Sequence, residues 1–433
     1  MPKRLADPIR RFLRSEFARQ GVLVFVSTTM TNLFGYVFHF ILSRKLGVEV
    51  YGALSALLGG FMIFSVPAAV ITTVVVKYAA EFRATGSTGR IRALVRRAAT
   101  VLGGAAFAAA FLGLALSGTF AAFLHIGDRA AVMLLVIIWC LNLLTPALRG
   151  VLQGTEDFVS FSISCVLEAA LKTAFAVAFA FAGFGLEGVM LGWLIGTSLA
   201  LAYTAGVLFG RYRNVAGEPL FLDYRRLLGT SGGVALATLC LTSLGFSDVV
   251  IVKHYFPPRE AGLYGAASLA GKMLFWLVGF VPTIVLPRAT SLAASGRQPL
   301  PVLLQAVAVV AVMAGSGLFV FSAFPSFVVG TLAGKSFAAA APLVFPYGIA
   351  TVLLAALNSV IFYKMGIHRF DFVAPLAVVA VGEIVAISLF HASLIRVVET
   401  LIGGNALGLA AALYRINTPV VSVAKAKAGG AAA

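Results

Sequence analysis

Long apolar stretches separated by short polar and basic segments dominate the chain. Ala130–Thr145 contains no charged residue, and Val373–Leu389 contains only Glu383. A helix that spans a bilayer needs about 20 mostly apolar residues. Twelve stretches come close to this pattern and predict an all-α integral membrane protein. The predicted spans are 21–43, 50–75, 97–118, 130–153, 159–183, 187–209, 231–255, 261–286, 300–323, 339–363, 372–392 and 397–414.

The polar segments divide these spans into two sets of six. Pro8–Gln20 alternates apolar and basic residues in the manner of a helix that lies on an anionic membrane surface. The last residues are rich in Ala, Gly and Lys, which is typical of disorder. The predicted order is a cytoplasmic amphipathic segment (1–20), an N-terminal six-helix lobe (21–210), a cytoplasmic linker (211–230), a C-terminal six-helix lobe (231–414) and a disordered cytoplasmic tail (415–433).

Two landmarks suggest that the lobes are copies of one unit. Tyr51-Gly52-Ala53 with Ser55 recurs as Tyr264-Gly265-Ala266 with Ser268, and Gly154 with Phe158 recurs as Gly366 with Phe370. The offsets are nearly equal, 213 and 212 positions (264 − 51 and 366 − 154). Because six is an even number of spans, the two copies would share one orientation, as in transporters built from parallel repeats.

Composition supports the membrane assignment, and the charge distribution gives the orientation. The sequence is 60% hydrophobic and 11% charged, whereas soluble domains are about 45–50% apolar and about 25% charged. With the N-terminus inside, most of the 33 lysines and arginines fall on the cytoplasmic side, as the positive-inside rule requires. The net charge of +17 therefore needs no nucleic-acid partner, and we expect both termini in the cytoplasm of a cell-membrane protein.

Metal, redox and nucleotide chemistry have no support in the sequence. The three cysteines, Cys140, Cys165 and Cys240, fall inside predicted spans without metal-ligand spacing. No Gly-rich nucleotide motif is present. We expect no catalytic residue, no metal and no bound cofactor, and therefore no enzyme.

The loop Ser43-Arg-Lys-Leu-Gly-Val-Glu-Val-Tyr-Gly-Ala-Leu-Ser55 resembles the R-x-L-G-x-x-x-Y-G loop of the polysaccharide flippases. Asp248-Val-Val-Ile-Val-Lys253, followed by Glu260-Ala-Gly-Leu-Tyr264-Gly, is similar to a second signature of that family. These O-antigen or Wzx-type flippases belong to the multidrug/oligosaccharidyl-lipid/polysaccharide (MOP) exporter superfamily. The resemblance implies a MATE-like V of two parallel six-helix bundles, and a lipid-linked oligosaccharide moved to the outer leaflet by alternating access.

Ionisable groups at membrane depth are costly and usually face a cavity or each other. Lys272, near the middle of the eighth span, either binds an anionic headgroup or pairs with an acid such as Asp248. Glu168 and Lys172 lie four residues apart on one helical face, so they form either an internal ion pair or part of a substrate or coupling site. Arg149 and Arg288, near inner helix ends, either reach the membrane surface or contact the headgroup.

The remaining candidates concern coupling, gating and the first span. Asp248 with Lys253 forms either an outer salt bridge or gate, or part of a cation-coupling site. Glu383 is either protonated and hydrogen-bonded or a Na⁺ or H⁺ site. His39 is either a packed interfacial residue or a substrate contact that titrates near neutral pH.

Three functions remain open. A flippase for a polyprenyl-(pyro)phosphate-linked oligosaccharide would contact membrane lipids and work beside a glycan polymerase or glycosyltransferases. An ion-coupled exporter of drugs or organic cations from the same superfamily would use buried acids as binding groups. A membrane-bound glycosyltransferase or ligase would need catalytic acids on a sizeable external loop, whereas the predicted external loops are short.

Overall fold

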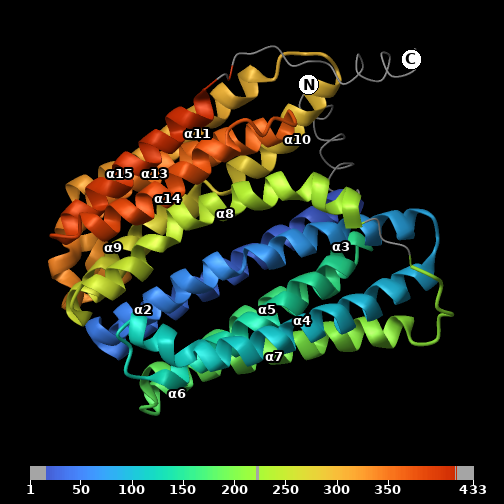
Figure 1. Ribbon diagram of the computed structural model, residues 1–433, viewed down its shortest axis with the longest axis horizontal. Helices are drawn as coiled ribbons and strands as arrows, with labels where there is room; N and C mark the ends of the chain where they lie inside the picture. Colours follow the sequence, from blue (N-terminus) through green and yellow to red (C-terminus); the bar gives the residue numbers. More distant parts are fainter. Residues whose placement is uncertain (1–15, 221–223, 415, 417–433) are drawn as a thin grey trace, which may run out of the picture. The chain divides into compact units, whose positions relative to one another are not determined.

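The computed structural model describes residues 16–220, 224–414 and 416, and every regular element in this part of the chain is a helix (Figure 1). The first half contains α2 (Glu16–Phe64), α3 (Val66–Ala84), α4 (Thr88–Phe123), α5 (Arg129–Gly154), α6 (Phe158–Phe181) and α7 (Gly185–Tyr212). The second half contains α8 (Tyr224–Tyr255), α9 (Pro258–Leu277), α10 (Phe280–Ala294), α11 (Leu300–Ala323), α12 (Pro325–Leu332), the 3₁₀ helix η1 (Lys335–Ala340), α13 (Ala341–Gly366), α14 (Val373–Leu389) and α15 (Leu394–Leu413). The predicted all-α class is confirmed.

Ten helices in the described part of the chain are long and apolar enough to cross a membrane. Two features separate this number from the predicted twelve. One helix runs from Val22 to Phe64 although Gly47 breaks its regular geometry with φ 76° and ψ 174°, a conformation that glycine adopts without a steric penalty. Helix α14 is apolar but only 17 residues long. The protein is thus a multi-pass membrane protein, and the count of twelve stays a prediction.

Several helices begin where the sequence provides a cap. The side chains of Asp128 and Asp157 accept hydrogen bonds from the backbone amides of Ala131 (3.0 Å) and Ser160 (3.2 Å). These bonds satisfy amides that the first turn of a helix leaves without a partner. Helix α9 begins with Pro258, whose missing N–H costs nothing at the first helical position.

The chain divides into two compact units. Unit 1 comprises 1–46 and 67–227, and unit 2 comprises 47–66 and 228–433. The division at Leu227 falls within the predicted linker, while the segment from Gly47 to Val66 belongs with unit 2.

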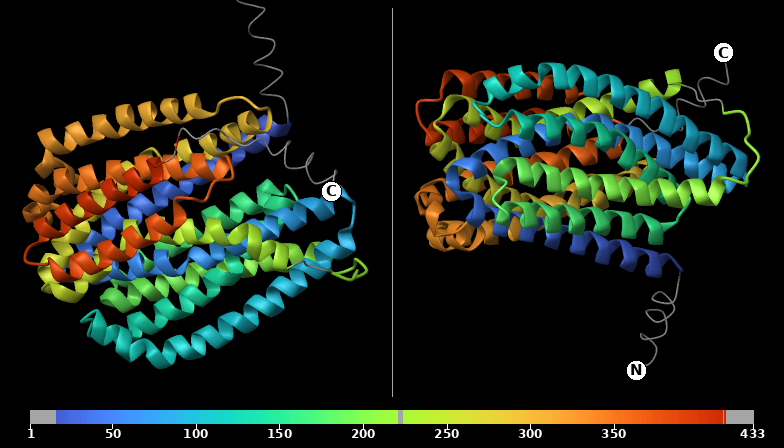
Figure 2. Two further views of the ribbon diagram at one scale, coloured as in Figure 1. Left: turned by 45° about the horizontal axis from the view of Figure 1, so that its top comes forward. Right: turned by 90° about the horizontal axis from the view of Figure 1, so that it is seen from below.

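Unit 1 is held together mainly by α4, α5, α6 and α7. Helices α6 and α7 run side by side, and α5 packs against both α4 and α7 (Figures 1 and 2). A buried cluster that includes Val75, Leu94, Leu148, Val151 and Leu208 joins α3, α4, α5 and α7.

Unit 2 is organised around α13. This helix packs against α9, α10, α11 and α15, and α14 packs against α15. One core cluster, with Val281, Leu357 and Leu376, lies among α8, α10, α11, α13 and α14. A second cluster, with Val252, Tyr264 and Leu401, surrounds the polar groups described below.

The two Tyr-Gly-Ala landmarks pack against each other within unit 2. A Cβ added to Gly52 would lie 2.6 Å from the backbone nitrogen of Gly262, and one added to Gly265 would lie 2.7 Å from the hydroxyl of Ser55. These distances are shorter than a Cβ allows, so both glycines permit a helix contact that alanine would force apart. Tyr51 is fully buried here, with its ring edge-to-face on Phe337 at 5.5 Å.

The second landmark forms the same turn in each unit. After Gly154, Glu156 has φ 57°, and the amide of Asp157 donates to the carbonyl of Leu152 at 2.8 Å. After Gly366, His368 has φ 56°, and the amide of Arg369 donates to the carbonyl of Lys364 at 2.9 Å. The two left-handed residues are 212 positions apart (368 − 156), which supports the internal repeat.

Gly154 and Gly366 also sit in matching contacts. Gly154 approaches Val76 and Ala79 of α3, whereas Gly366 approaches Leu286 and Ala289 of α10. The repeat therefore includes helix packing as well as the turn. Most of the amphipathic segment 1–20, residues 221–223 of the predicted linker and nearly all of the predicted tail 415–433 lie outside the described residues.

Candidate functional site

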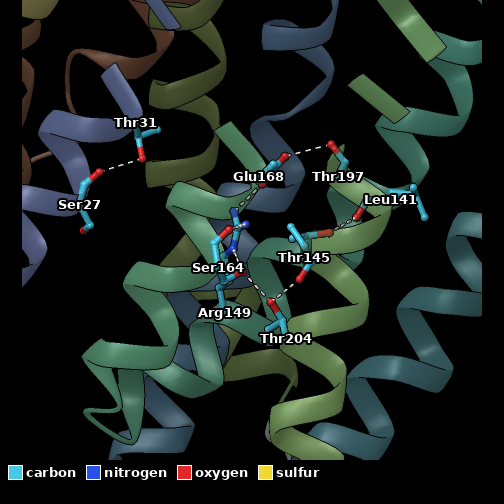
Figure 3. Close-up of polar contacts among 10 residues, drawn as sticks. Ser27, Thr31, Leu141, Thr145, Arg149, Ser164, Glu168, Thr197 and Thr204 are labelled. Carbon is cyan, nitrogen blue, oxygen red and sulfur yellow. Dashed lines mark hydrogen bonds and ion pairs between the residues drawn. The ribbon is translucent and has the colours of Figure 1, made fainter. Parts of the chain in front are cut away.

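Arg149 of α5 forms the centre of a polar network in unit 1 (Figure 3). Its guanidinium nitrogen lies 2.7 Å from a carboxylate oxygen of Glu168 on α6. Two further guanidinium nitrogens donate to the hydroxyl and the carbonyl of Ser164, each at 2.7 Å. All three guanidinium nitrogens therefore have protein partners, and the geometry is that of a structural ion pair.

Helix α7 completes this network. Thr197 donates to the other carboxylate oxygen of Glu168 at 3.0 Å, and the hydroxyls of Thr204 and Ser164 are 2.6 Å apart (Figure 3). Of the two interpretations of Glu168 and Lys172, the internal ion pair is not found, because Arg149 holds this carboxylate and no ion pair joins Glu168 to Lys172 within the described chain. Spacing along one helix could not predict this partner of Glu168, because Arg149 lies on another helix, α5.

Lys172 instead lies among aromatic rings. Its ammonium is 5.1 Å from the ring centroid of Phe38 and 5.1 Å from that of Trp193. A cation over aromatic faces gains electrostatic attraction from the ring quadrupoles. The two rings thus accommodate Lys172 within unit 1, and the charge of Glu168 also acts on it without a direct ion pair among the described residues.

Asp248 is the centre of a buried hydrogen-bond network in unit 2. Its side chain is 1% exposed, and one carboxylate oxygen accepts from the hydroxyls of Tyr264 (2.9 Å) and Tyr347 (2.6 Å). The hydroxyl of Tyr347 also lies 2.9 Å from that of Ser268, which belongs to the second copy of the repeated motif. The other oxygen of Asp248 is buried and has no hydrogen-bond partner in the part of the chain that the structure describes.

Glu383 of α14 lies in the same region and is 3% exposed, and neither carboxylate oxygen has a hydrogen-bond partner among the described residues. A Cβ at Gly404 of α15 would lie 2.1 Å from one of these oxygens, so this glycine makes room for the carboxylate. The neighbouring Asn405 donates to the carbonyl of Ala350 at 3.1 Å, and its own side-chain oxygen has no partner. Buried polar atoms in proteins are nearly always bonded, so these four oxygens make the region a candidate functional site.

Lys272 of α9 lines a cavity of about 250 Å³ within unit 2. Its ammonium lies 4.4 Å from the ring centroid of Phe246. No ion pair joins Lys272 to Asp248 or to another acid in the described part of the chain. Lys272 and Asp248 therefore form no direct ion pair among the described residues, although the charge of Asp248 acts on Lys272 from a greater distance.

The cavity combines polar groups with aromatic walls. Tyr347 and Asn405, which belong to the acidic region, also line it, so the two sites share part of one wall. The polar lining consists of Thr238, Thr242, Lys272, Tyr347, Thr351, Asn358 and Asn405, and the aromatic lining includes Phe246, Phe275 and Phe362.

The remaining predicted residues are Lys253, Arg288 and His39. Lys253 is 2% exposed in the last turn of α8, and Arg288 is exposed on α10. His39 is half-buried on α2 of unit 1, with its ring edge-to-face on Phe38 at 5.4 Å. None of the three lines the cavity.

Sequence reasoning did not select Tyr264, Tyr347 or Asn405. Tyr264 did stand in the repeated motif, and its role there is to bind Asp248 from the adjacent helix. Tyr347 and Asn405 carried no signal in the sequence, because a neutral polar residue in an apolar helix is common. Their importance comes from the partners that tertiary packing brings to them.

A second buried lysine in unit 2 is fully paired. Lys364, 1% exposed, donates to Asp371 at 3.1 Å and to the carbonyl of Tyr414 at 2.8 Å. Burial opposes ionisation of Asp371, but the hydrogen bond and charge of Lys364, together with Arg369, outweigh it and hold the pKa of this carboxyl below its usual value. This cluster fixes the end of α13 to the following loop and to Tyr414 after α15.

No protein-family profile matches the sequence, and no curated protein matches it. Solved structures match it closely in fold. An inward-facing multidrug resistance MATE family transporter of the MOP superfamily gives a TM-score of 0.74 at 14% identity, covering 89% of this chain and 92% of that chain. The lipid II flippase MurJ in an inward closed conformation gives a TM-score of 0.66 at 12% identity, covering 93% of this chain and 88% of that chain.

A third relative in fold is a MOP superfamily transporter from Pyrococcus furiosus, for which a reversed polarity of the binding pocket suggests a different function. It gives a TM-score of 0.52 at 13% identity and covers 92% of this chain and 95% of that chain. The chain therefore has the fold of MOP superfamily transporters, as its resemblance to their flippases implied. Its substrate has to be inferred from its own residues.

Proposed function

We propose that the protein is a flippase that moves a polyprenyl-(pyro)phosphate-linked oligosaccharide from the inner to the outer leaflet of the cell membrane by alternating access. The observation that carries the proposal is the polarity of the cavity in unit 2. Among the described residues that line it, Lys272 is the only charged one. A lysine in such a site offers a point positive charge to an anionic substrate group.

The competing function, export of organic cations, would need an acid in contact with the substrate. Within the described chain, the buried acids do not line this cavity. Glu168 is neutralised by Arg149, and Asp248 is bonded to two tyrosine hydroxyls. These contacts favour an anionic substrate over a cationic one.

We further propose that Asp248 and Glu383 form the coupling site for Na⁺ or H⁺. Their unpartnered oxygens, with that of Asn405, lie on α8, α14 and α15 around one core cluster. Oxygen ligands suit hard cations, and buried acids commonly relay protons in transporters. No bound cofactor is needed for this function.

Deletion of the gene provides the first test. Loss of surface glycan, restored by the wild-type chain, supports the flippase. Intact glycan together with hypersensitivity to cationic drugs would instead establish the exporter. Accumulated lipid-linked oligosaccharide on the inner leaflet separates a flipping defect from a defect in glycan synthesis.

Lys272→Gln then tests the site. We expect this variant to reach the membrane at the wild-type level and to lose most glycan export. Lys335→Gln is the matched control, because Lys335 is an exposed lysine of the same unit outside the cavity. Wild-type export by Lys272→Gln would remove Lys272 from the site.

The coupling proposal is tested with Glu383→Gln in vesicles that hold a defined pH or Na⁺ gradient. We expect transport by this variant to lose its dependence on the coupling gradient. An unaltered dependence would exclude Glu383. Cytoplasmic termini and contact with a glycan polymerase or glycosyltransferases remain part of this proposal, testable by reporter fusions and crosslinking.

A further inference from the structure

The charge and the polar groups of the unit 2 cavity do not match a pyrophosphate. A pyrophosphate carries two or more negative charges, and proteins usually hold such a group with several cations or a row of backbone amides. Among the described residues, the cavity has one ammonium, that of Lys272, and no second cation. The site is therefore matched to a ligand with a single negative charge.

Neutral hydrogen-bonding groups surround this charge. Thr242 and Asn358 make no hydrogen bond with another described residue, and the side-chain oxygen of Asn405 has no partner. The hydroxyls of Thr238 and Thr351 donate to carbonyls of their own helices and keep lone pairs that accept. Side-chain amides and hydroxyls on several walls suit a ligand with several hydroxyl groups.

The remaining walls are apolar and aromatic. Phe246, Phe275 and Phe362 line the cavity, and the Phe246 ring lies directly under the Lys272 ammonium. The C–H face of a sugar ring packs well on such surfaces. The volume of about 250 Å³ is below the range of roughly 300–1,000 Å³ that takes drug-sized ligands, so one sugar ring fits and a whole oligosaccharide does not.

We infer that this cavity binds one carboxylated sugar unit of the transported glycan, with the carboxylate on Lys272, the hydroxyls on the threonines and asparagines, and the ring against the phenylalanines. This inference rests on the proposed flippase function and names the part of the substrate that unit 2 recognises. It predicts that the substrate glycan contains an acidic hexose.

The test measures binding of matched sugars to the full-length protein in lipid nanodiscs by saturation-transfer NMR. Methyl β-glucuronide and methyl β-glucoside differ only at C6, where one has a carboxylate and the other a hydroxymethyl group. We expect the glucuronide to bind about tenfold or more tightly, because a charge-assisted hydrogen bond to Lys272 is available to it alone. Tetraethylammonium and inorganic pyrophosphate are measured in parallel.

Variants assign the preference to the cavity. Lys272→Gln should lower the affinity for the glucuronide to that for the glucoside. Lys335→Gln should leave the difference between the two affinities intact. Asn358→Ala should weaken the binding of both sugars by similar factors, because the Asn358 amide would hydrogen-bond to hydroxyl groups that both sugars have. Circular dichroism and the thermal midpoint of each variant exclude misfolding as the cause.

The outcomes separate the two proposals. Equal affinity for the two sugars, or tighter binding of pyrophosphate than of glucuronide, overturns the carboxylated-sugar inference while glycan export in the deletion strain still supports the flippase. Preferential binding of tetraethylammonium, together with intact surface glycan in that strain, overturns both. A glucuronide preference that survives in Lys272→Gln places the anion elsewhere and also overturns the inference.

Discussion

In unit 1, the charges at membrane depth satisfy one another: Arg149 binds Glu168, and Lys172 lies over two aromatic rings. In the described part of unit 2, the carboxylate oxygens of Glu383 have no hydrogen-bond partner, and Lys272 faces a cavity and forms no ion pair. Both units share a turn and a helix contact at the same repeat offset. Stability and function thus place different demands on similar repeats, and the buried groups of unit 2 are the ones that the proposed substrate and coupling ion would bind.

The largest effect is expected where unit 1 loses half of its ion pair. Arg149→Ala leaves the largely buried Glu168 without its ion-pair partner, and breaking a buried pair in this way costs about 3–5 kcal/mol. The thermal midpoint of the purified protein should fall sharply.

The double variant Arg149→Ala/Glu168→Ala provides the control. It should recover part of the loss, since no unpaired charge remains. If both Arg149→Ala and the double variant melt like the wild type, the pair is not structural and the contrast between the units disappears.

A second prediction compares the repeated glycines. Ala at position 154 would place Cβ 2.5 Å from the carbonyl of Val76, whereas Ala at position 366 would place it 2.8 Å from that of Leu286. Overpacking of this kind costs about 1–3 kcal/mol. Both Gly154→Ala and Gly366→Ala should lower the thermal midpoint, with the larger decrease for Gly154→Ala.

Gly206 is the matched control, because it lies in α7 with nothing within 4 Å of an added Cβ. Gly206→Ala should keep or raise the midpoint, since alanine favours the helix by about 1 kcal/mol. A decrease as large as that of Gly154→Ala would show that glycine matters here for a reason other than close packing.

The same substitution in the two units should act in opposite directions. Glu168→Gln removes the charge that Arg149 needs and should lower the thermal midpoint. Glu383→Gln replaces a buried carboxyl group that has no hydrogen-bond partner among the described residues, and it should leave stability unchanged or raise it by about 1 kcal/mol. Equal destabilisation by both variants would mean that Glu383 holds the fold, contrary to its assignment as a coupling residue.

Acid should weaken the ion pair between the buried Lys364 and the loop residue Asp371 in unit 2. The pKa of Asp371 is lowered in the folded state, so its contribution to stability is complete above the ordinary value of 3.8 and is lost as the pH falls through the lowered value. Asp371→Asn should cost about 1–3 kcal/mol at neutral pH by leaving Lys364 without its counter-ion.

The pH dependence identifies the cause of that loss. Thermal midpoints of Asp371→Asn and the wild type should converge as the pH is lowered below 3.8. A constant difference between the two down to the acid limit would assign the effect to packing.

The apolar pattern was sufficient for the class of fold and for most helices, because lipid requires long apolar segments whatever their neighbours are. It was also sufficient to mark Lys272, Asp248 and Glu383, since an ionisable residue in an apolar stretch is visible without a structure. Pairing was not predictable: Glu168 has Lys172 in its own helix but binds Arg149 from α5. The roles of Tyr347 and Asn405 depend on helices distant in sequence, which no local pattern reports.

The smallest effect concerns the repeated turn, where both units hold a non-glycine residue at positive φ. Glycine relieves the steric cost of this conformation, about 1 kcal/mol. His368→Gly should therefore raise the free energy of unfolding by about 1 kcal/mol, and the thermal midpoint should rise with it. Glu156→Gly should gain less stability, because it also removes a surface ion pair with Arg83. The side chains of Arg83 and Glu156 are 46% and 50% exposed, and ion pairs this exposed contribute little. An equal loss of stability in both variants would mean that the side chains, and not the shared backbone turn, determine this part of the repeat.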